Sequence, residues 1–161
     1  MRRVAVLATL ACALALPAAA TADDQSVYNS FHFSHPRFKK LRRDFEHGER
    51  HWENSGYQDP SEANRACRRT VDLSHKVVDK MQAKHTSTDL GRSAKHDAVN
   101  GLKYRRRWAD AERLAIESFM NFGGAGYIRR HRKAKDYIKK AQRYEARAQK
   151  SFKEAGVNTA P

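Results

Sequence analysis

The side chains with the clearest chemical potential are the basic residues near the end of the chain. Residues 127–154 contain eleven lysines and arginines but only three acidic residues. On a helix, most of these cations fall on one stripe, which is interrupted only by Asp136. Such a row can follow the charges of an anionic polymer, with binding that weakens as salt rises. The candidate polyanion-binding residues are Arg129, Arg130, Lys133, Lys140, Arg143, Arg147 and Lys150.

Two tyrosines border this stripe. Tyr137 and Tyr144 are seven residues apart, so they lie two helical turns apart on one side of the helix. Their rings could stack on bases or on sugar rings of a bound polymer. We therefore include both tyrosines in the predicted polyanion-binding surface.

The alternative is that the cations only keep one side of a helix in water. Solvation alone favours mixed signs spaced for pairing between residues i and i+4. Here most of the net charge of +14 lies in this one stretch. The triplet Arg105-Arg106-Arg107 could extend the patch, although three consecutive residues span about 200° of a helix and cannot all face one ligand.

Histidines and aspartates provide a second candidate chemistry. Asp44, His47 and His51 are spaced i, i+3 and i+7, and Asp72 and His75 are spaced i and i+3. Imidazole and carboxylate on adjacent helical turns can chelate zinc, copper or nickel. Pairs of this kind also occur by chance on exposed helix faces. We therefore predict no metal site, and keep these five residues as an alternative set of ligands.

Two further residues are predicted to be structural. Cys67 lies in the middle of an apolar stripe, which is typical of a buried thiol. His131 falls on an apolar face, where we expect it to bond a buried acid such as Glu117 or the backbone.

Catalytic motifs are absent from the sequence. It contains no nucleophile elbow, phosphate-binding glycine loop, H-E-x-x-H or C-x-x-C. Glu112 and Glu117 are five residues apart on one helix, so they do not face each other as a glycosidase pair would. We predict a protein that is not an enzyme and needs no cofactor.

The elements that position these residues are predicted to be four amphipathic helices. Apolar residues recur every three or four positions over residues 37–54, 60–84, 88–122 and 127–155. The pattern predicts an all-α protein, namely an antiparallel four-helix bundle over residues 37–155. The glycines at 123, 124 and 126 would turn the last two helices into a long helical hairpin. Asn100-Gly101 marks either a kink or a close approach of two helices.

The two flanks of the bundle are predicted to lack regular structure. Residues 23–36 have no sustained period but contain Tyr28, Phe31 and Phe33, so we expect an extended arm that lays its rings over the bundle. Residues 156–161 are expected to be a frayed tail.

The first 22 residues have the order of a secretory signal peptide. Arg2 and Arg3 precede an uncharged apolar run from Val4 to Leu16, and small residues end the segment at Ala22. We expect cleavage after residue 22 and a secreted or periplasmic protein.

These observations predict an exported, non-enzymatic protein that binds through a cationic helical surface. Its partner would be an anionic polymer, a cell-envelope surface or an acidic protein. Nucleic acid would be bound without sequence specificity, and contact with membranes would be peripheral and driven by charge, without insertion. The alternatives are a periplasmic metal-handling protein and a helical self-assembly protein. The sequence does not predict the oligomeric state.

Overall fold

Helices make up the regular structure of this protein. The computed structural model describes residues 22–159, and no strand occurs within that range. The elements are α1 (Ala22–His32), α2 (His35–Asn54), α3 (Ser61–Gln82), α4 (Asp89–Phe122) and α5 (Gly124–Glu154). The all-α prediction is confirmed. The predicted leader lies outside the described residues except for Ala22, as do residues 160–161 of the predicted tail.

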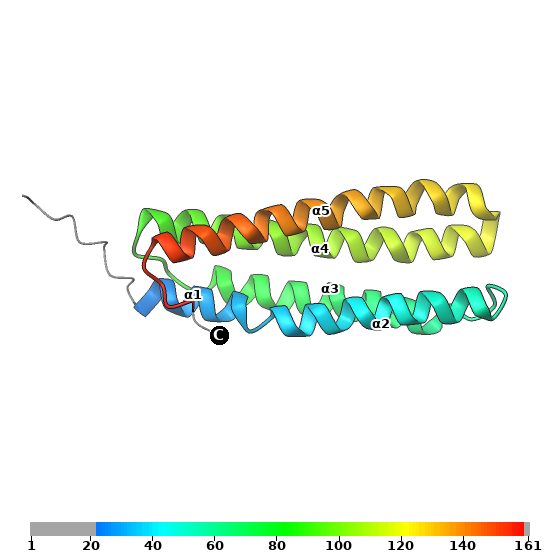
Figure 1. Cartoon of the computed structure of the whole chain (residues 1–161), viewed down its shortest axis with the longest axis horizontal. Helices are drawn as coiled ribbons and strands as arrows, with labels where there is room; N and C mark the ends of the chain where they lie inside the picture. The colour runs from blue at the N-terminus through cyan, green and yellow to red at the C-terminus, as the bar shows by residue number, and fades with distance from the viewer. Residues whose placement is uncertain (1–21, 160–161) are drawn as a thin grey trace, which may run out of the picture.

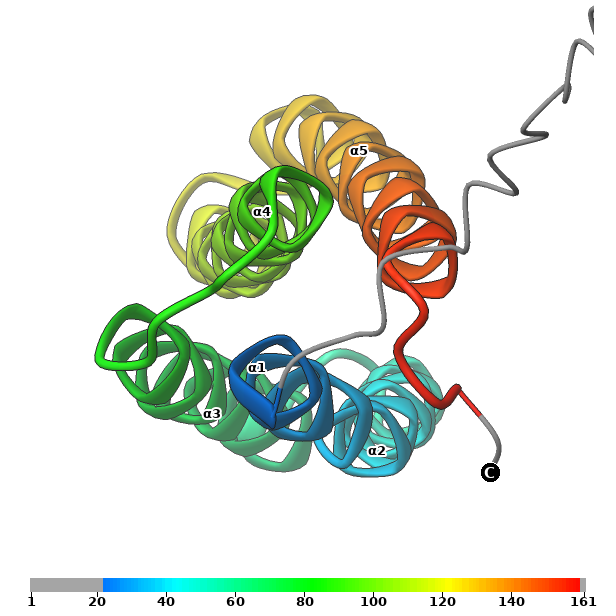
Figure 2. The ribbon, with the colours of Figure 1, turned by 90° about the vertical axis from the view of Figure 1, so that its left-hand side faces the viewer.

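The four long helices are arranged as two neighbouring pairs. α4 and α5 lie side by side along one half of the molecule, and α2 and α3 lie side by side along the other (Figure 1). A view along the long axis shows the four helices around a common interior, with α1 beside α3 (Figure 2). The α4–α5 turn and the α2–α3 loop lie at one end of the molecule, and α1 lies toward the other.

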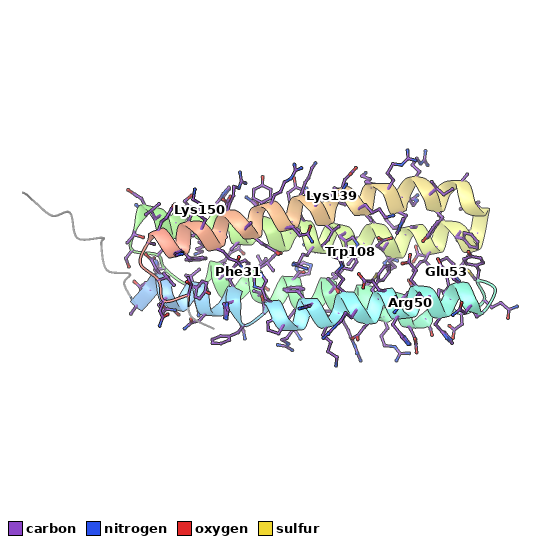
Figure 3. The ribbon with its side chains drawn as sticks, in the orientation of Figure 1. Phe31, Arg50, Glu53, Trp108, Lys139 and Lys150 are labelled. Atoms are coloured by element: carbon purple, nitrogen blue, oxygen red, sulfur yellow. The ribbon has the colours of Figure 1, made fainter. Side chains whose placement is uncertain are left out.

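Apolar side chains fill the interior in two clusters. One cluster includes Phe31, Phe38 and Phe152 and lies near α1. The other includes Trp52 and Trp108 and lies nearer the α4–α5 turn. Figure 3 shows Phe31 and Trp108 between the two helix pairs. Burial of these large side chains is the main force that holds the helices together.

α2 is positioned against the start of α3 by a glycine. Pro36 suits the first turn of α2, and Phe38, Phe45 and Trp52 recur every seven residues on its buried face. A Cβ atom at Gly48 would lie 2.4 Å from the backbone nitrogen of Ala63. Gly48 therefore permits the two helices to approach more closely than any other residue would.

α4 is continuous through Gly101. It spans 34 residues, and Thr88 caps its start by accepting a hydrogen bond of 2.8 Å from the backbone N–H of Gly91. A Cβ atom at Gly101 would lie 2.8 Å from Cγ of Glu145 in α5. The glycine therefore serves close helix approach and does not kink the helix. Fully buried alanines on both helices support the same contact: Ala94, Ala98, Ala134, Ala141 and Ala148.

The prediction of an extended arm over residues 23–36 is wrong in its conformation. Residues 22–32 form α1, and α2 already begins at His35. Val27, Tyr28 and Phe31 are buried on one side of α1, so the rings do pack onto the bundle as expected. Buried Asp24 accepts hydrogen bonds from the Ser87 N–H (2.9 Å) and from the Thr88 hydroxyl (2.6 Å). The apolar period of α1 is irregular in the sequence because one buried position is a carboxylate, which binds Ser87 and the capping residue Thr88 at the start of α4.

The prediction of a frayed tail is also wrong for residues 156–159. Gly156 has φ of 78°, and the Val157 N–H donates to the Phe152 carbonyl at 3.1 Å, which is a Schellman-type end of a helix. Val157 is buried in the cluster near α1. The Asn158 N–H donates to Oε1 of Gln25 at 2.9 Å. The apolar side chain after the glycine anchors the segment that follows α5.

Candidate polyanion-binding surface

The predicted cations all lie exposed on α5. Their carbon chains point away from the buried alanine face because the interior positions recur at Ala134, Ala141 and Ala148. Figure 3 labels Lys139 and Lys150 along the outer side of this helix. The structure thus brings together, on one element, the whole predicted set: Arg129, Arg130, Lys133, Lys140, Arg143, Arg147 and Lys150.

Few of these cations are neutralised by an acid. Arg147 pairs with Asp97 of α4 at 3.3 Å, and Lys150 lies 3.7 Å from Glu154. The other five form no ion pair with any residue between positions 22 and 159. Because exposed pairs contribute only about 0–1 kcal/mol, an anionic ligand could displace even the two that exist.

One acid of α5 does not reduce the surface charge, because it is internal. Glu145 is buried and forms a bidentate pair with Arg105 of α4, in which Nη2 of Arg105 lies 2.6 Å from Oε2. Burial by itself would raise the pKa of Glu145, but the interactions with His35 and Arg105 outweigh it and lower the pKa. The Arg105 guanidinium also lies over the Phe38 ring, at 5.1 Å. Arg105 therefore belongs to the interior and does not extend the cationic patch.

Tyr137 and Tyr144 are half-buried and lie at the boundary between α4 and α5. Tyr104 of α4 stacks on Tyr144 with ring centroids 5.5 Å apart and lies 6.1 Å from the Tyr137 ring. We call Tyr104, Tyr137 and Tyr144 the tyrosine row. Tyr104 was not among the predicted residues because it lies on α4, outside the cationic stripe of α5. Its position four residues before Trp108, beside the apolar stripe of α4, was a usable signal.

Cations lie over the rings of the tyrosine row. Cζ of Arg147 is 4.4 Å from the Tyr144 centroid, and Nζ of Lys133 is 5.9 Å from that of Tyr137. The Tyr104 ring has Cζ of Arg107 at 5.1 Å and Nζ of Lys140 at 5.7 Å. Each contact of this kind contributes about 0.5–1 kcal/mol at an exposed site. The rings thereby hold long, otherwise mobile cations along one line.

A shallow pocket opens at one end of the tyrosine row. It has a volume of about 210 Å³ and lies between α4 and α5. Three cations and one acid line it, together with apolar atoms: Arg107, Asp110, Ala111, Leu114, Arg130, Lys133 and Tyr137. The excess of positive charge suits an anionic group.

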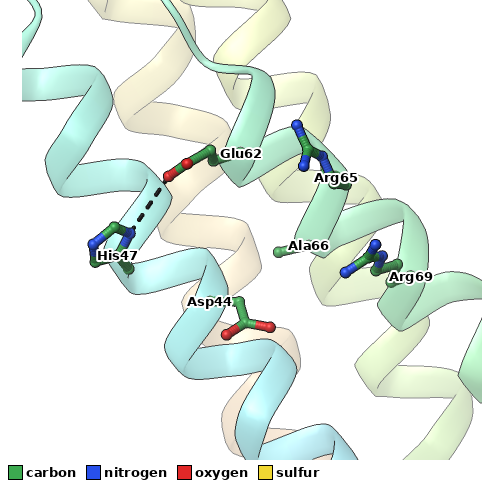
Figure 4. A pocket seen from close by; sticks show the side chains of 6 residues that line it. All are labelled: Asp44, His47, Glu62, Arg65, Ala66 and Arg69. Atoms are coloured by element: carbon green, nitrogen blue, oxygen red, sulfur yellow. Dashed lines mark ion pairs between the residues drawn. The ribbon is translucent and has the colours of Figure 1, made fainter.

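The alternative metal ligands are not brought together. Asp44 and His47 line a pocket between α2 and α3, where Nδ1 of His47 lies 3.4 Å from Oε2 of Glu62 (Figure 4). Arg65 and Arg69 line the same pocket and place positive charge where a cation would sit. Within residues 22–159, no group of three or more His, Cys, Asp or Glu side chains could hold a metal ion.

Of the second half of that predicted set, only Asp72 shares a pocket with a residue of the first half. Nε2 of His75 lies 3.1 Å from Nη1 of Arg106, so a cationic neighbour occupies the direction of a ligand bond. Asp72 and Asp44 line a second pocket together, but Arg37, Lys40, Arg69 and Lys76 line it too and place positive charge around the two carboxylates. His51 is exposed on the next turn of α2. The spacing along each helix is as predicted, but cationic side chains line both pockets beside the carboxylates.

His131 bonds a buried acid, but the acid is not Glu117. Nδ1 of His131 lies 2.8 Å from Oε2 of Glu112, and Glu117 instead pairs with Arg113. Nε1 of Trp108 donates to Oε1 of Glu112 at 3.2 Å. Burial raises the pKa of Glu112, and the hydrogen bond with His131 offsets only part of that rise.

Tyr127 connects this pair to α2. Its ring stacks on His131 with centroids 5.3 Å apart, and its hydroxyl donates to Oε1 of Glu49 at 2.8 Å. Burial, followed by the bond to Glu49, raises the pKa of the Tyr127 phenol. These groups satisfy one another inside the bundle. They join α2, α4 and α5 through polar contacts in an otherwise apolar region.

Cys67 is fully buried, as predicted. Burial raises the pKa of its thiol, so the reactive thiolate form is disfavoured. No helix between residues 22 and 159 combines the length and apolar character that a membrane span requires.

Comparison of the chain with models of known protein families, with curated proteins and with solved structures found no match.

Proposed function

We propose that this protein is an exported, non-enzymatic binding protein whose α5 surface contacts an anionic polymer, an anionic cell-envelope surface or an acidic protein. The observation that carries the proposal is the charge on α5. Arg129, Arg130, Lys133, Lys140 and Arg143 are exposed and have no ion-pair partner among the described residues, while Glu145 is buried against Arg105. A surface built only for solvation would pair more of its charges.

We also propose that the scaffold is an antiparallel four-helix bundle in which α4 and α5 form a long helical hairpin. Two observations support this arrangement. Gly123 alone separates the two helices and has φ of 78°, a conformation that favours glycine. Gly101 of α4 lies against Glu145 and Ala141 of α5. A stiff pair of helices would keep the cations in a fixed line over several turns.

The physical basis of binding would be release of counterions from the polymer. Each lysine or arginine that neutralises a polymer charge frees a condensed ion, so affinity falls linearly on a logarithmic scale as salt rises. The positive field of α5 would also speed encounter with the polymer. Neither effect reads a sequence of bases or sugars. Nucleic acid would accordingly be bound without sequence specificity.

The tyrosine row would add a preference for polymers that contain rings. Tyr104, Tyr137 and Tyr144 each have a cation near the ring face, so a base or sugar would compete with that cation for the same face. Stacking on an aromatic residue contributes about 1–3 kcal/mol per base. A partner that carries both negative charge and rings would bind more tightly, because counterion release and stacking would both contribute to affinity.

The proposal is tested by salt elution of residues 23–161 from a heparin column and from a plain cation exchanger. The test variant carries Lys133→Gln, Lys140→Gln, Arg143→Gln and Arg147→Gln. The control variant removes the same charge from α2 and α3 through Lys39→Gln, Arg43→Gln, Arg68→Gln and Lys80→Gln. All four control positions are exposed, and none has an ion pair with a described residue.

We expect heparin to retain the native protein to higher salt than the exchanger does. Only the α5 variant should lose this excess, because its cations lie in one line while those of the control are spread over two helices. If both variants lose retention equally on both columns, the proposed directional surface is refuted. The cations of α5 would then serve only to keep the helix solvated.

A further inference from the structure

Large apolar side chains are exposed where α4 meets α5. Phe122, the last residue of α4, is 85 % exposed, Met120 is 49 % exposed, and Ile128 of α5 is 58 % exposed. We call residues 118–133 the α4–α5 end. Figure 1 shows that it forms one extremity of the long axis, opposite α1. Exposed apolar groups that gather in one place, with polar residues around them, commonly mark a surface that something else covers.

The same segment carries only positive charge. Residues 118–133 contain no Asp or Glu, and Arg129, Arg130, Arg132 and Lys133 are all exposed. On the neighbouring helix pair, Glu49 accepts a hydrogen bond from the Tyr127 hydroxyl at 2.8 Å, and Glu53 (Figure 3) and Asp59 lie near the α2–α3 connection. The cations therefore belong to the α4–α5 side of this extremity.

We propose that the α4–α5 end docks on an anionic lipid bilayer, with Phe122, Met120 and Ile128 entering the boundary between headgroups and acyl chains. Arg129, Arg130, Arg132 and Lys133 would contact the lipid phosphates. Basic and apolar groups on one short segment are what interfacial anchoring requires. The sequence suggested contact by charge alone because the apolar face of α5 is lean. The bulky anchors instead lie where the two helices meet, and Phe122 and Met120 belong to α4.

Shape and charge favour a bilayer over other occupants. The α4–α5 end lies beside the α2–α3 loop at one extremity of the molecule, and a fluid layer can adapt to an uneven surface of this kind, whereas a protein partner would need a complementary one. A second copy of this chain would bring another set of unpaired cations against the first. Like charges at short range oppose such a contact.

The base of the α4–α5 end is firmly packed. Phe119 lies 5.1 Å from the Trp52 ring, 4.7 Å from that of Tyr57 and 5.9 Å from that of Tyr127. Phe122 belongs to neither buried cluster. Its replacement should therefore leave the fold intact, which permits a direct test.

The test uses residues 23–161 with vesicles of phosphatidylcholine and with vesicles of equal parts phosphatidylcholine and phosphatidylglycerol. The variant is Phe122→Ser. The matched control is Phe33→Ser, because Phe33 is also a phenylalanine, is 69 % exposed, and lies between α1 and α2, far from the α4–α5 end. Binding is measured by sedimentation with the vesicles. Insertion is measured by quenching of Phe122→Trp and Phe33→Trp by brominated lipids, since Trp52 and Trp108 are buried.

We expect native protein and Phe33→Ser to bind the anionic vesicles well and the neutral ones weakly. Phe122→Ser should bind the anionic vesicles about tenfold more weakly, because the transfer of a phenyl ring out of water is lost. Brominated lipid should quench the tryptophan fluorescence of Phe122→Trp more than that of the native protein. The fluorescence of Phe33→Trp should be quenched only as much as that of the native protein.

Three outcomes would overturn the proposal. Equal binding by native protein and Phe122→Ser would show contact by charge alone. Quenching of Phe33→Trp instead of Phe122→Trp would place the anchor at the other end. A native mass in solution that rises with concentration, and falls in Phe122→Ser, would make the α4–α5 end a contact between copies. Elution of Phe122→Ser from heparin should match the native protein in every case, so polyanion binding by α5 is tested separately.

Discussion

At the scale of single residues, charged side chains occupy two different environments in this protein. Glu112 and Glu145 lie inside the bundle and are held by His131 and Arg105, whereas the lysines and arginines of α5 remain in water. Breaking a buried pair by removing one partner commonly costs about 3–5 kcal/mol because the remaining charge stays buried. The internal acids therefore have structural roles, and the outer cations are free to bind.

The Glu112 carboxyl should make stability depend on pH. Its pKa is higher in the folded chain than the ordinary value of 4.5, because burial disfavours the charged form. A group of this kind stabilises the fold fully below its unfolded pKa and loses that contribution as pH rises through its folded pKa. Glu112→Gln stays neutral and keeps the shape of the side chain. We expect the free energy of unfolding of Glu112→Gln, relative to that of the native protein, to increase as pH rises above 4.5.

Urea unfolding of both proteins at several pH values measures this difference. Glu117→Gln is the control, since Glu117 is exposed and pairs only with Arg113 on its own helix. A native-minus-variant difference that stays constant across the pH series would mean that folding does not raise the pKa of Glu112.

At the scale of elements, glycines decide how closely the helices approach. Gly48 faces the backbone of α3, and Gly124 at the start of α5 has nothing within 4 Å of an added Cβ. Gly124 also lacks a positive φ, so alanine fits its conformation. A Cβ atom would therefore clash at Gly48 but not at Gly124, and the local sequence does not distinguish these two helical glycines.

Alanine substitutions at these two positions should change stability in opposite directions. Gly48→Ala should destabilise by about 1–3 kcal/mol, because its Cβ would meet the Ala63 nitrogen at 2.4 Å and a backbone must move. Gly124→Ala should stabilise by about 0.4–1 kcal/mol through a lower entropy of the unfolded chain. Thermal unfolding of each variant beside the native protein measures both. A stabilised Gly48→Ala would contradict the close approach of α2 and α3.

At the scale of the whole molecule, one extremity carries both cations and exposed apolar side chains. The cations run along α5, three of the exposed apolar residues (Met120, Phe122 and Ile128) lie at the α4–α5 end, and α1 lies toward the opposite extremity. Asp24 of α1 binds the start of α4, and Gln25 binds the segment after α5. The first residues after the predicted leader therefore tie the termini of other elements together.

Expression of the full chain in a secreting cell tests the predicted export and signal-peptide cleavage. We expect the exported protein to begin at Asp23, since small residues precede that position and the apolar run ends before it. Sequencing of the N-terminus and the intact mass of the exported protein measure the cleavage site. Replacement of Leu10 and Leu14 by Arg, within the apolar run, is expected to abolish export. Retention of residues 1–22 in the exported protein would rule out a cleaved signal.

The sequence by itself determined the features that depend on a local repeat. Apolar residues every three or four positions predicted the helical class, the burial of Cys67 and the outward direction of the α5 cations, because a helix imposes one period on its own side chains. Only the tertiary structure decided which side chains meet across helices. Glu112 rather than Glu117 reaches His131, Arg105 reaches Glu145, and Tyr104 joins Tyr144. Such partners depend on the rotation and offset of packed helices, which no single helix encodes.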